Sequence, residues 1–162
     1  EWVEPMAEVC LALGCKQAMV VHSKDGLDEI SVADETLVTE VKSGDIYNYK
    51  IRHENYGIPA DNIDNLVTET PKQSLELTMK VLDGEPGADL NIVLINAGTA
   101  IYLSGVAKDI SDGIDKARAA INNGDARKKL DELVELSHQL KDSKCQPSTE
   151  TTTQHSNDEK IS

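Results

Sequence analysis

The chain has 162 residues, enough for one domain with its own hydrophobic core and too few for two domains of ordinary size. Sixteen Lys and Arg residues against 29 Asp and Glu residues give a formal net charge of -13. This charge argues against a surface that holds nucleic acid or an anionic membrane, so a phosphate ligand would need a metal ion beside it.

The first part of the chain predicts a helix, a buried strand and a hairpin. Apolar residues at helical spacing predict a helix over residues 4–13. Residues 18–21, AMVV, are apolar on both faces, which is typical of a strand inside a parallel sheet covered by helices. Residues 36–41 and 46–51 alternate around a turn at 43–45, so they predict an antiparallel hairpin.

A loop and a well-marked helix follow the hairpin. Residues 53–64 carry Gly, Pro and several Asp and Asn residues without a clear period, which predicts a loop with one helical turn. Thr70, Pro71 and Gln73 then supply an N-cap, a first-turn proline and the partner of a capping box. This helix should end at the turn formed by residues 84–87.

The run LNIVLINAGTAIYLSG, residues 90–105, carries no charge and is apolar nearly all round. With Asp89 as its cap, it predicts a buried central helix. A membrane span is the alternative, but a span needs about 20 predominantly apolar residues, and polar residues such as Asn91 and Asn96 interrupt this run. We therefore expect no membrane segment here.

The chain should end in two more helices and a tail. Ser111 is the expected cap of a helix that runs to about Asn122, and a last amphipathic helix carries apolar residues between 130 and 140. Residues 141–162 are rich in Ser, Thr, Gln and Asn and should form a disordered polar tail. The fold class that follows is α/β, with a parallel strand, an antiparallel hairpin and surrounding helices.

Two adjacent acids, Asp28 and Glu29, follow the predicted buried strand in the loop SKDGLDE. Ligands of open α/β sheets gather beyond the carboxyl ends of parallel strands, and Gly26 allows this loop to turn both acids toward one cation. Mg²⁺ typically takes one or two carboxylates and completes its shell with water and phosphate oxygens. The simpler interpretation is a solvated acidic loop, which the spacing alone favours.

Other reactive residues carry weaker signals. His22 is either an acid/base group or a structural histidine at a strand end, and Lys24 either attracts phosphate or is an exposed loop lysine. The chain contains no nucleophile elbow, phosphate-binding glycine loop or dinucleotide fingerprint. Cys10, Cys15 and Cys145 form neither a disulfide framework nor a zinc pattern, so a reduced, cytoplasmic location fits best.

Two long segments resemble one enzyme family. VEPMAEVCLALGCKQAMVVHSKDGLDEIS and NIVLINAGTAIYLSGVAKDISDGIDKARAAINNGDARKKLDELVELS are similar to the C-terminal part of the anthranilate phosphoribosyltransferase family, and ENYGI is similar to its loop after the hairpin. The resemblance covers about residues 3–137, and H-x-x-D-G-L-D-E is its most specific part. It implies a phosphoribosyltransferase/nucleoside phosphorylase-like α/β domain with a mostly parallel sheet.

The resemblance also implies an activity and a site. The family transfers the 5-phosphoribosyl group of phosphoribosyl pyrophosphate to anthranilate in tryptophan biosynthesis, releases pyrophosphate, and acts as a homodimer when full-length. Mg²⁺ on the pyrophosphate would be held by Asp28 and Glu29.

This sequence also departs from the family pattern. Position 23 is Ser where the family commonly has Gly. The family's glycine-rich pyrophosphate loop, Lys-His-Gly-Asn segment, anthranilate-binding Arg and helical dimerisation domain have no counterpart here. We therefore expect residues 1–140 to be the C-terminal portion of the catalytic domain, incomplete and inactive alone.

Two other interpretations stay open at this point. The acceptor of a related phosphoribosyltransferase or a pyrimidine nucleoside phosphorylase would be chosen by residues that this chain lacks. A non-catalytic interaction module with an acidic surface would also explain the charge of the chain.

Overall fold

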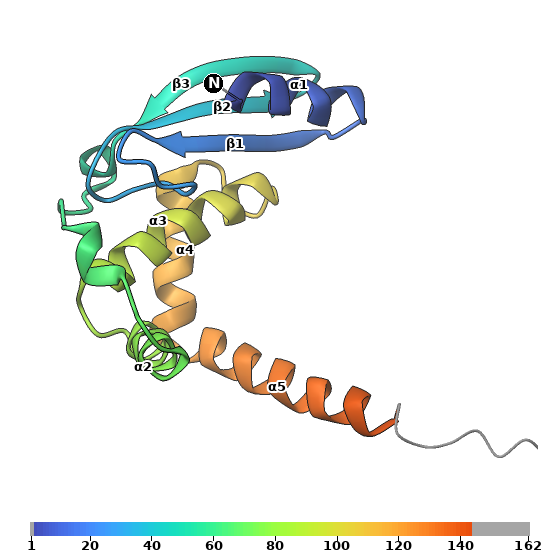
Figure 1. The fold of residues 1–162 in the computed structure, drawn as a ribbon. Helices are drawn as coiled ribbons and strands as arrows, with labels where there is room; N and C mark the ends of the chain where they lie inside the picture. Colours follow the sequence, from blue (N-terminus) through green and yellow to red (C-terminus); the bar gives the residue numbers. More distant parts are fainter. Residues whose placement is uncertain (1, 144–162) are drawn as a thin grey trace, which may run out of the picture. The chain divides into compact units, whose positions relative to one another are not determined.

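The computed structural model describes residues 2–143, of which residues 2–128 belong to one compact unit and residues 129–143 to a second. The elements in chain order are α1 (Val3–Ala12), β1 (Gln17–Ser23), β2 (Thr36–Lys42), β3 (Asp45–Ile51), the 3₁₀ turns His53–Tyr56 and Ile63–Leu66, α2 (Pro71–Leu82), α3 (Ala88–Leu103), α4 (Ile110–Asn122) and α5 (Asp125–Ser143) (Figure 1). The predicted α/β class, with a hairpin and surrounding helices, is confirmed.

The three strands form one sheet in the order β1-β2-β3, and both pairs are antiparallel. Ser23 lies opposite Thr36, so the chain leaves β1 and returns into its direct neighbour. The expected parallel strand at residues 18–21 is therefore wrong for the described part of the chain, 2–143. The apolar run carries no information on strand direction, and its residues are half-buried in β1.

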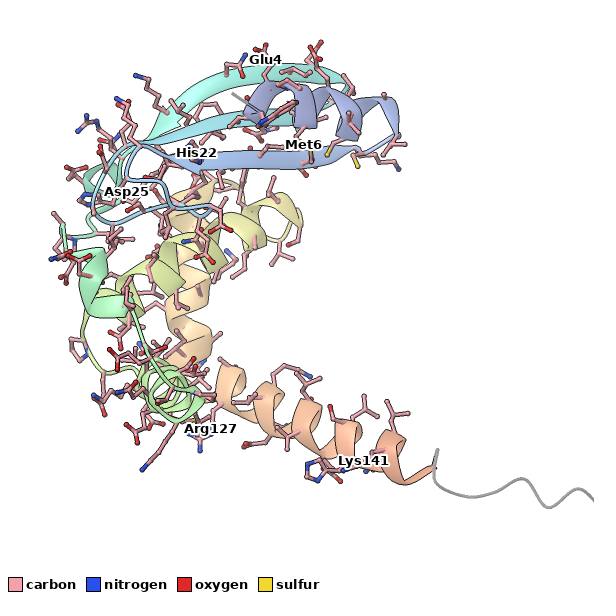
Figure 2. All side chains as sticks on the ribbon, in the orientation of Figure 1. Glu4, Met6, His22, Asp25, Arg127 and Lys141 are labelled. Carbon is pink, nitrogen blue, oxygen red and sulfur yellow. The ribbon has the colours of Figure 1, made fainter. Side chains whose placement is uncertain are left out.

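The two faces of the sheet pack against different helices. On β2, Val38 belongs to the core that α3 completes, whereas Leu37 and Thr39 belong to the face beneath α1. This alternation follows the two-residue period of a strand. On α1 the side chain that is fully buried is Ala7, while Met6, which the helical pattern placed among the apolar positions, is half exposed (Figure 2).

Local sequence signals explain the turn between β2 and β3. Ser43 and Gly44 have φ values of 56° and 89°, the left-handed values that a two-residue type I′ hairpin turn requires at both central positions. Lys42 and Asp45 flank the turn as partners in the register. The predicted hairpin is confirmed.

The helix starts were predicted with mixed success. The capping box of α2 is present: the Gln73 amide donates to Thr70 Oγ1 at 3.2 Å, and the Thr70 amide donates to Gln73 Oε1 at 3.1 Å. The predicted caps of the next two helices are wrong. Gly87 is the N-cap of α3, and Asp109 caps α4 by accepting from the Asp112 amide at 2.8 Å. The residues expected as caps instead lie in the first turns of these helices.

Two glycines bring α3 and α4 into backbone contact. A Cβ atom added to Gly113 would lie 2.1 Å from the carbonyl oxygen of Gly98, and one added to Gly98 would lie 2.6 Å from the amide nitrogen of Ile114. The close approach lets Ile114 and Ala117 join Leu94 in the buried core. One face of α3 is buried, with Leu94 and Ile95 fully enclosed, but Val93 is exposed, so the helix predicted from the apolar run 90–105 is central but not buried all round.

A polar cluster ties α3 to the sheet. Glu40 on β2 is buried and accepts hydrogen bonds from Tyr102 at 2.7 Å and from Tyr49 at 2.8 Å. Lys42 donates to the Tyr102 hydroxyl at 2.9 Å. Burial, together with the Glu40 carboxylate, raises the pKa of Tyr49. The hydroxyl therefore stays protonated, and remains a hydrogen-bond donor, at neutral pH.

The second unit contains the rest of α5. Its described residues, 129–143, form the expected amphipathic helix, on which Leu133 and Leu140 are exposed. The tail predicted to be disordered begins at residue 141, but α5 continues to Ser143, and residues 144–162 lie outside the described part. Among the residues that the structure describes, no helix combines the length and apolarity that crossing a bilayer demands.

We predict that Gly113→Ala lowers the free energy of unfolding of the 162-residue chain by about 1–3 kcal/mol, because the added methyl group meets backbone that cannot rotate away. Chemical denaturation followed by circular dichroism measures this change. Ser111→Ala, at an exposed position of the same helix, is the control and should stay within about 0.5 kcal/mol of the unaltered chain. Equal stability of the two variants would contradict the proposed contact.

Candidate functional site

Residues 24–35 form the loop between β1 and β2, and this loop carries the predicted acid pair. Gly26 adopts φ = 94°, a left-handed value that suits glycine, and its amide donates to Ser23 O at 3.1 Å. The Ser23 amide in turn donates to Leu27 O at 2.9 Å. The chain therefore makes a tight turn immediately before Asp28.

Asp25 organises the interior of this loop. Its carboxylate accepts from the Leu27 amide at 3.1 Å and from Ser31 Oγ at 2.5 Å, while Ser31 Oγ accepts from the Ala33 amide at 2.9 Å. Although burial opposes the shift, hydrogen bonds led by that from Ser31 lower the pKa of Asp25. Asp25 is thus a structural acid of the loop, a role that the sequence pattern did not reveal.

Asn96, on α3, holds the loop just after the acid pair. Its Oδ1 accepts from the Ile30 amide at 3.0 Å, and its Nδ2 donates to Ile30 O at 2.9 Å and to Ile92 O at 2.9 Å. Ile30 itself is 1% exposed and belongs to the core. In the sequence, Asn96 is recognisable only as a polar interruption of an apolar helix.

Three cations surround the carboxylate at the end of the loop. Lys24 and Lys50 both lie 2.8 Å from Glu35 Oε1, and Arg52 lies 3.2 Å from Glu35 Oε2. The hydrogen bond from Lys24, followed by that from Lys50, lowers the pKa of Glu35 from 4.5 to about 2. Lys24, a candidate phosphate ligand on sequence grounds, is therefore engaged in an ion pair within the loop.

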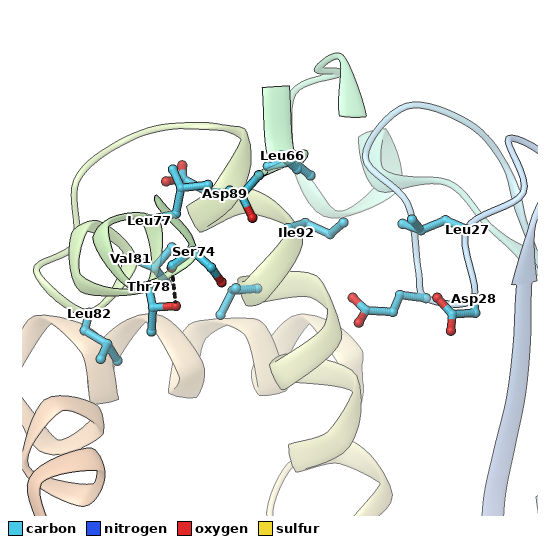
Figure 3. A pocket seen from close by; sticks show the side chains of 13 residues that line it. Leu27, Asp28, Leu66, Ser74, Leu77, Thr78, Val81, Leu82, Asp89 and Ile92 are labelled. Atoms are coloured by element: carbon cyan, nitrogen blue, oxygen red, sulfur yellow. Dashed lines mark hydrogen bonds between the residues drawn. The ribbon is translucent and has the colours of Figure 1, made fainter. Parts of the chain in front are cut away.

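Asp28 and Glu29 are exposed and line the same cavity of about 450 Å³. Figure 3 shows Leu27 and Asp28 on one side of it, residues of α2 such as Leu77 and Val81 on the other, and Ile92 of α3 between them. The acid pair lies at one end of this cavity, and the opposite wall is largely apolar but also carries Asp89, Ser74 and Thr78. Both predicted site residues line the cavity, and their role as metal ligands stays a prediction.

His22 does not belong to this cavity. It is exposed near the end of β1 and lines a different hollow with residues of α1 and β1, including Met6; Figure 2 labels both residues. Cys10 and Cys15 are free thiols remote from the acid pair in the chain. Among the described residues 2–143, the acid pair therefore lines the cavity of about 450 Å³, whereas His22 lines a separate hollow.

The donor set of the site is small. Across residues 2–143 there is no group of three or more His, Cys, Asp or Glu side chains that is arranged to hold a metal ion. Asp28 and Glu29 would therefore supply two carboxylates at most. Mg²⁺ accepts such a set because it retains water and binds phosphate oxygens, whereas a calcium or zinc site built from protein alone needs more ligands.

Comparison with known sequences identifies close relatives. Residues 1–127 match the sequence profile described as glycosyl transferase family, a/b domain. The chain is 46% identical over 132 residues to the anthranilate phosphoribosyltransferase of Vesicomyosocius okutanii, a match that covers 82% of this chain and 39% of that protein. The enzyme of the same name from a Marinomonas species is also 46% identical, over 138 residues and 39% of its length. The chain thus spans about two fifths of the length of these relatives.

Solved structures share the fold. The anthranilate phosphoribosyltransferase of Thermus thermophilus aligns with a TM-score of 0.74 at 30% identity, over 83% of this chain and 39% of that one. The Saccharomyces cerevisiae enzyme in complex with PRPP and Mg aligns with a TM-score of 0.72 over 82% of this chain and 39% of that one. At 21% identity, the second likeness establishes the fold alone.

We predict that Glu35→Gln removes a pH-dependent part of the stability of the chain. The folded pKa of Glu35 lies below its usual 4.5, so its contribution is complete above pH 4.5 and is lost as the pH falls towards about 2. The melting temperatures of the unaltered chain and of the variant should therefore differ at pH 7 and converge over that window. Glu69→Gln, at an exposed glutamate, is the control, and a difference that persists unchanged at pH 2 would contradict the assignment.

Proposed function

Because this chain belongs to the glycosyl transferase family, a/b domain, we propose that it is the C-terminal portion of an anthranilate phosphoribosyltransferase. The 46% identity to two such enzymes supports this assignment. The coverage of 39% of their length supports the view that residues 1–140 are one part of a larger catalytic domain and are inactive alone. We also propose that the full-length enzyme is a homodimer and that it is located in the cytoplasm.

The observation that carries the proposal is the acid pair at the cavity. Asp28 and Glu29 are neighbours in the chain, both are exposed, and both line one cavity. Two adjacent carboxylates fit a Mg²⁺ ion that arrives with a diphosphate, because the remaining positions of its shell go to water and phosphate oxygens. We propose Asp28 and Glu29 as the protein ligands of that ion.

The proposed reaction is displacement at the anomeric carbon of phosphoribosyl pyrophosphate. The amine of anthranilate forms the new C–N bond and loses a proton, while the C–O bond breaks and its electron pair leaves with pyrophosphate. A bound Mg²⁺ supplies stabilisation of the negative charge that grows on this leaving group. Asp28 and Glu29 would hold that ion, and the hydrogen bonds of the loop 24–35 fix the position of their backbone.

We predict that Asp28→Asn with Glu29→Gln, made in the full-length enzyme, raises the magnesium concentration for half-maximal activity and lowers turnover. The rise should be at least roughly tenfold, the lower bound for residues that merely support a metal ligand. Initial rates across a magnesium titration measure the effect.

The chain offers a matched control for this variant. Asp131 and Glu132 are another adjacent Asp-Glu pair, on the exposed surface of α5. Asp131→Asn with Glu132→Gln makes the same change in charge and should leave the magnesium dependence as it was. If the variant at 28 and 29 folds and shows an unaltered magnesium dependence, the metal role is refuted.

We predict that anthranilate is the preferred acceptor of the full-length enzyme. Labelled phosphoribosyl pyrophosphate, offered with anthranilate or with other aromatic and aliphatic amines, should yield a phosphoribosylated product chiefly with anthranilate. The 46% identity to two enzymes named anthranilate phosphoribosyltransferase supports this expectation. Transfer to a pyrimidine base or to another amine at equal rates would favour a related enzyme of the same fold.

A further inference from the structure

The side chain of Asn96 makes three hydrogen bonds, all of them to backbone groups. Its oxygen accepts from the Ile30 amide at 3.0 Å, and its nitrogen donates to Ile30 O at 2.9 Å and to Ile92 O at 2.9 Å. The carboxamide thus grips both polar groups of one loop residue while a third bond anchors it to its own helix. Two bonds to one residue fix its rotation as well as its position.

Ile30, whose amide and carbonyl are both bonded to Asn96, directly follows Glu29 in the chain. On the other side of the pair, the Leu27 amide donates to Asp25 at 3.1 Å and Leu27 O accepts from Ser23 at 2.9 Å. Asp28 and Glu29 are therefore the two residues between two backbone positions whose amide and carbonyl are both held. The fixed backbone positions of Leu27 and Ile30 therefore determine the path of the chain through Asp28 and Glu29.

We propose that Asn96 is a positioning residue for the magnesium site, and this rests on the function proposed above. By fixing Ile30, it holds Asp28 and Glu29 at the cavity in a geometry that both carboxylates can use at once. The side chain does not need to touch the ion or the substrate. It acts from α3, which the Gly98 and Gly113 contact packs closely against α4.

The chemistry of the amide explains why this position suits asparagine. Asn and Gln are the side chains that end in a carboxamide, with a donor NH₂ and an acceptor oxygen on one planar group, and Gln is longer by one methylene. Aspartate would turn a carboxylate oxygen toward the carbonyl oxygens of Ile30 and Ile92, which are both acceptors. The amide is also neutral, so it does not compete with Asp28 and Glu29 for a cation.

The test uses the full-length enzyme with two substitutions, Asn96→Ala and Asn96→Asp. Magnesium is titrated by calorimetry into enzyme saturated with phosphoribosyl pyrophosphate, so the readout is binding and does not depend on turnover. We predict that the Kd for magnesium rises about 10- to 100-fold in both variants. Turnover at saturating magnesium should recover most of its original value, because the reacting groups themselves are unchanged.

A control separates positioning from loss of stability. Thr99, one turn further along α3, is buried and donates to Ile95 O within the helix at 2.8 Å. Thr99→Val removes that bond without touching the loop, so it should lower the melting temperature and leave the Kd for magnesium unchanged. A comparable rise in Kd in this variant would show that any weakening of α3 is sufficient, which would overturn the proposal.

A double-mutant cycle distinguishes the metal-binding role proposed for Asp28 and Glu29 from the positioning role proposed for Asn96. In enzyme that already carries Asp28→Asn and Glu29→Gln, Asn96→Ala should cause no further rise in Kd, because residues that act as a unit are not additive. If the acid variant alone leaves the Kd unaltered, the proposed metal role fails. If the acid variant raises the Kd while both Asn96 variants leave it unchanged, only the role of Asn96 fails.

A measurement on unaltered enzyme covers the case in which neither Asn96 variant folds. The Ile30 amide, bonded to Asn96 Oδ1, should exchange its hydrogen slowly with and without magnesium and phosphoribosyl pyrophosphate. Exchange at the rate of a solvent-exposed amide would overturn the proposal, because the loop would not be held before the metal arrives.

Discussion

The site depends on how the loop 24–35 satisfies its backbone. A segment that runs through the core without helix or strand has amides and carbonyls that no regular ladder pairs, and leaving such groups unpaired in the interior is costly. Side chains therefore take over this task. Asn96 pairs with both polar groups of Ile30, Thr36 Oγ1 accepts from the Ser31 amide at 3.2 Å, and Asp25 accepts from the Leu27 amide.

The loop inherits its rigidity from the elements behind it. Ile30 is buried in the same core as Leu94 of α3, and α3 is packed against α4 through the backbone contact of Gly98 and Gly113. A change in the distance between the two helices would therefore move Asn96, and with it the point at which the chain leaves the core. The exposed acids Asp28 and Glu29 and the packed helices α3 and α4 all belong to one compact unit of the chain.

Charge is distributed unevenly around this loop. In a chain with a net charge of -13, three basic side chains converge on Glu35, where they stabilise its ionised form and fasten the end of the loop to β3. Asp28 and Glu29 instead are exposed at one end of a cavity whose opposite wall is largely apolar but includes Asp89. Two neighbouring carboxylates repel each other, so a cation shared between them would stabilise the ionised pair.

Much of this architecture could be predicted from the sequence, because it depends on residues close together in the chain. The positive φ values at Ser43 and Gly44 follow from turn chemistry, and the capping box of Thr70 and Gln73 closes within one helical turn. The acid pair was a candidate for the same reason, since its two members are adjacent. The resemblance to a known family then raised that candidate above a solvated loop.

The tertiary structure decided the features that join distant parts of the chain. The Asn96 side chain meets Ile30 across 66 positions, and Lys50 of β3 and Arg52 just after it reach Glu35 in the loop. The direction of β1 and the burial of Ala7 depend likewise on which partner each face meets. Periodicity tells which residues share a face of a helix or strand. Only the packed chain determines what that face contacts, because the energy of a contact depends on the residues on both of its sides.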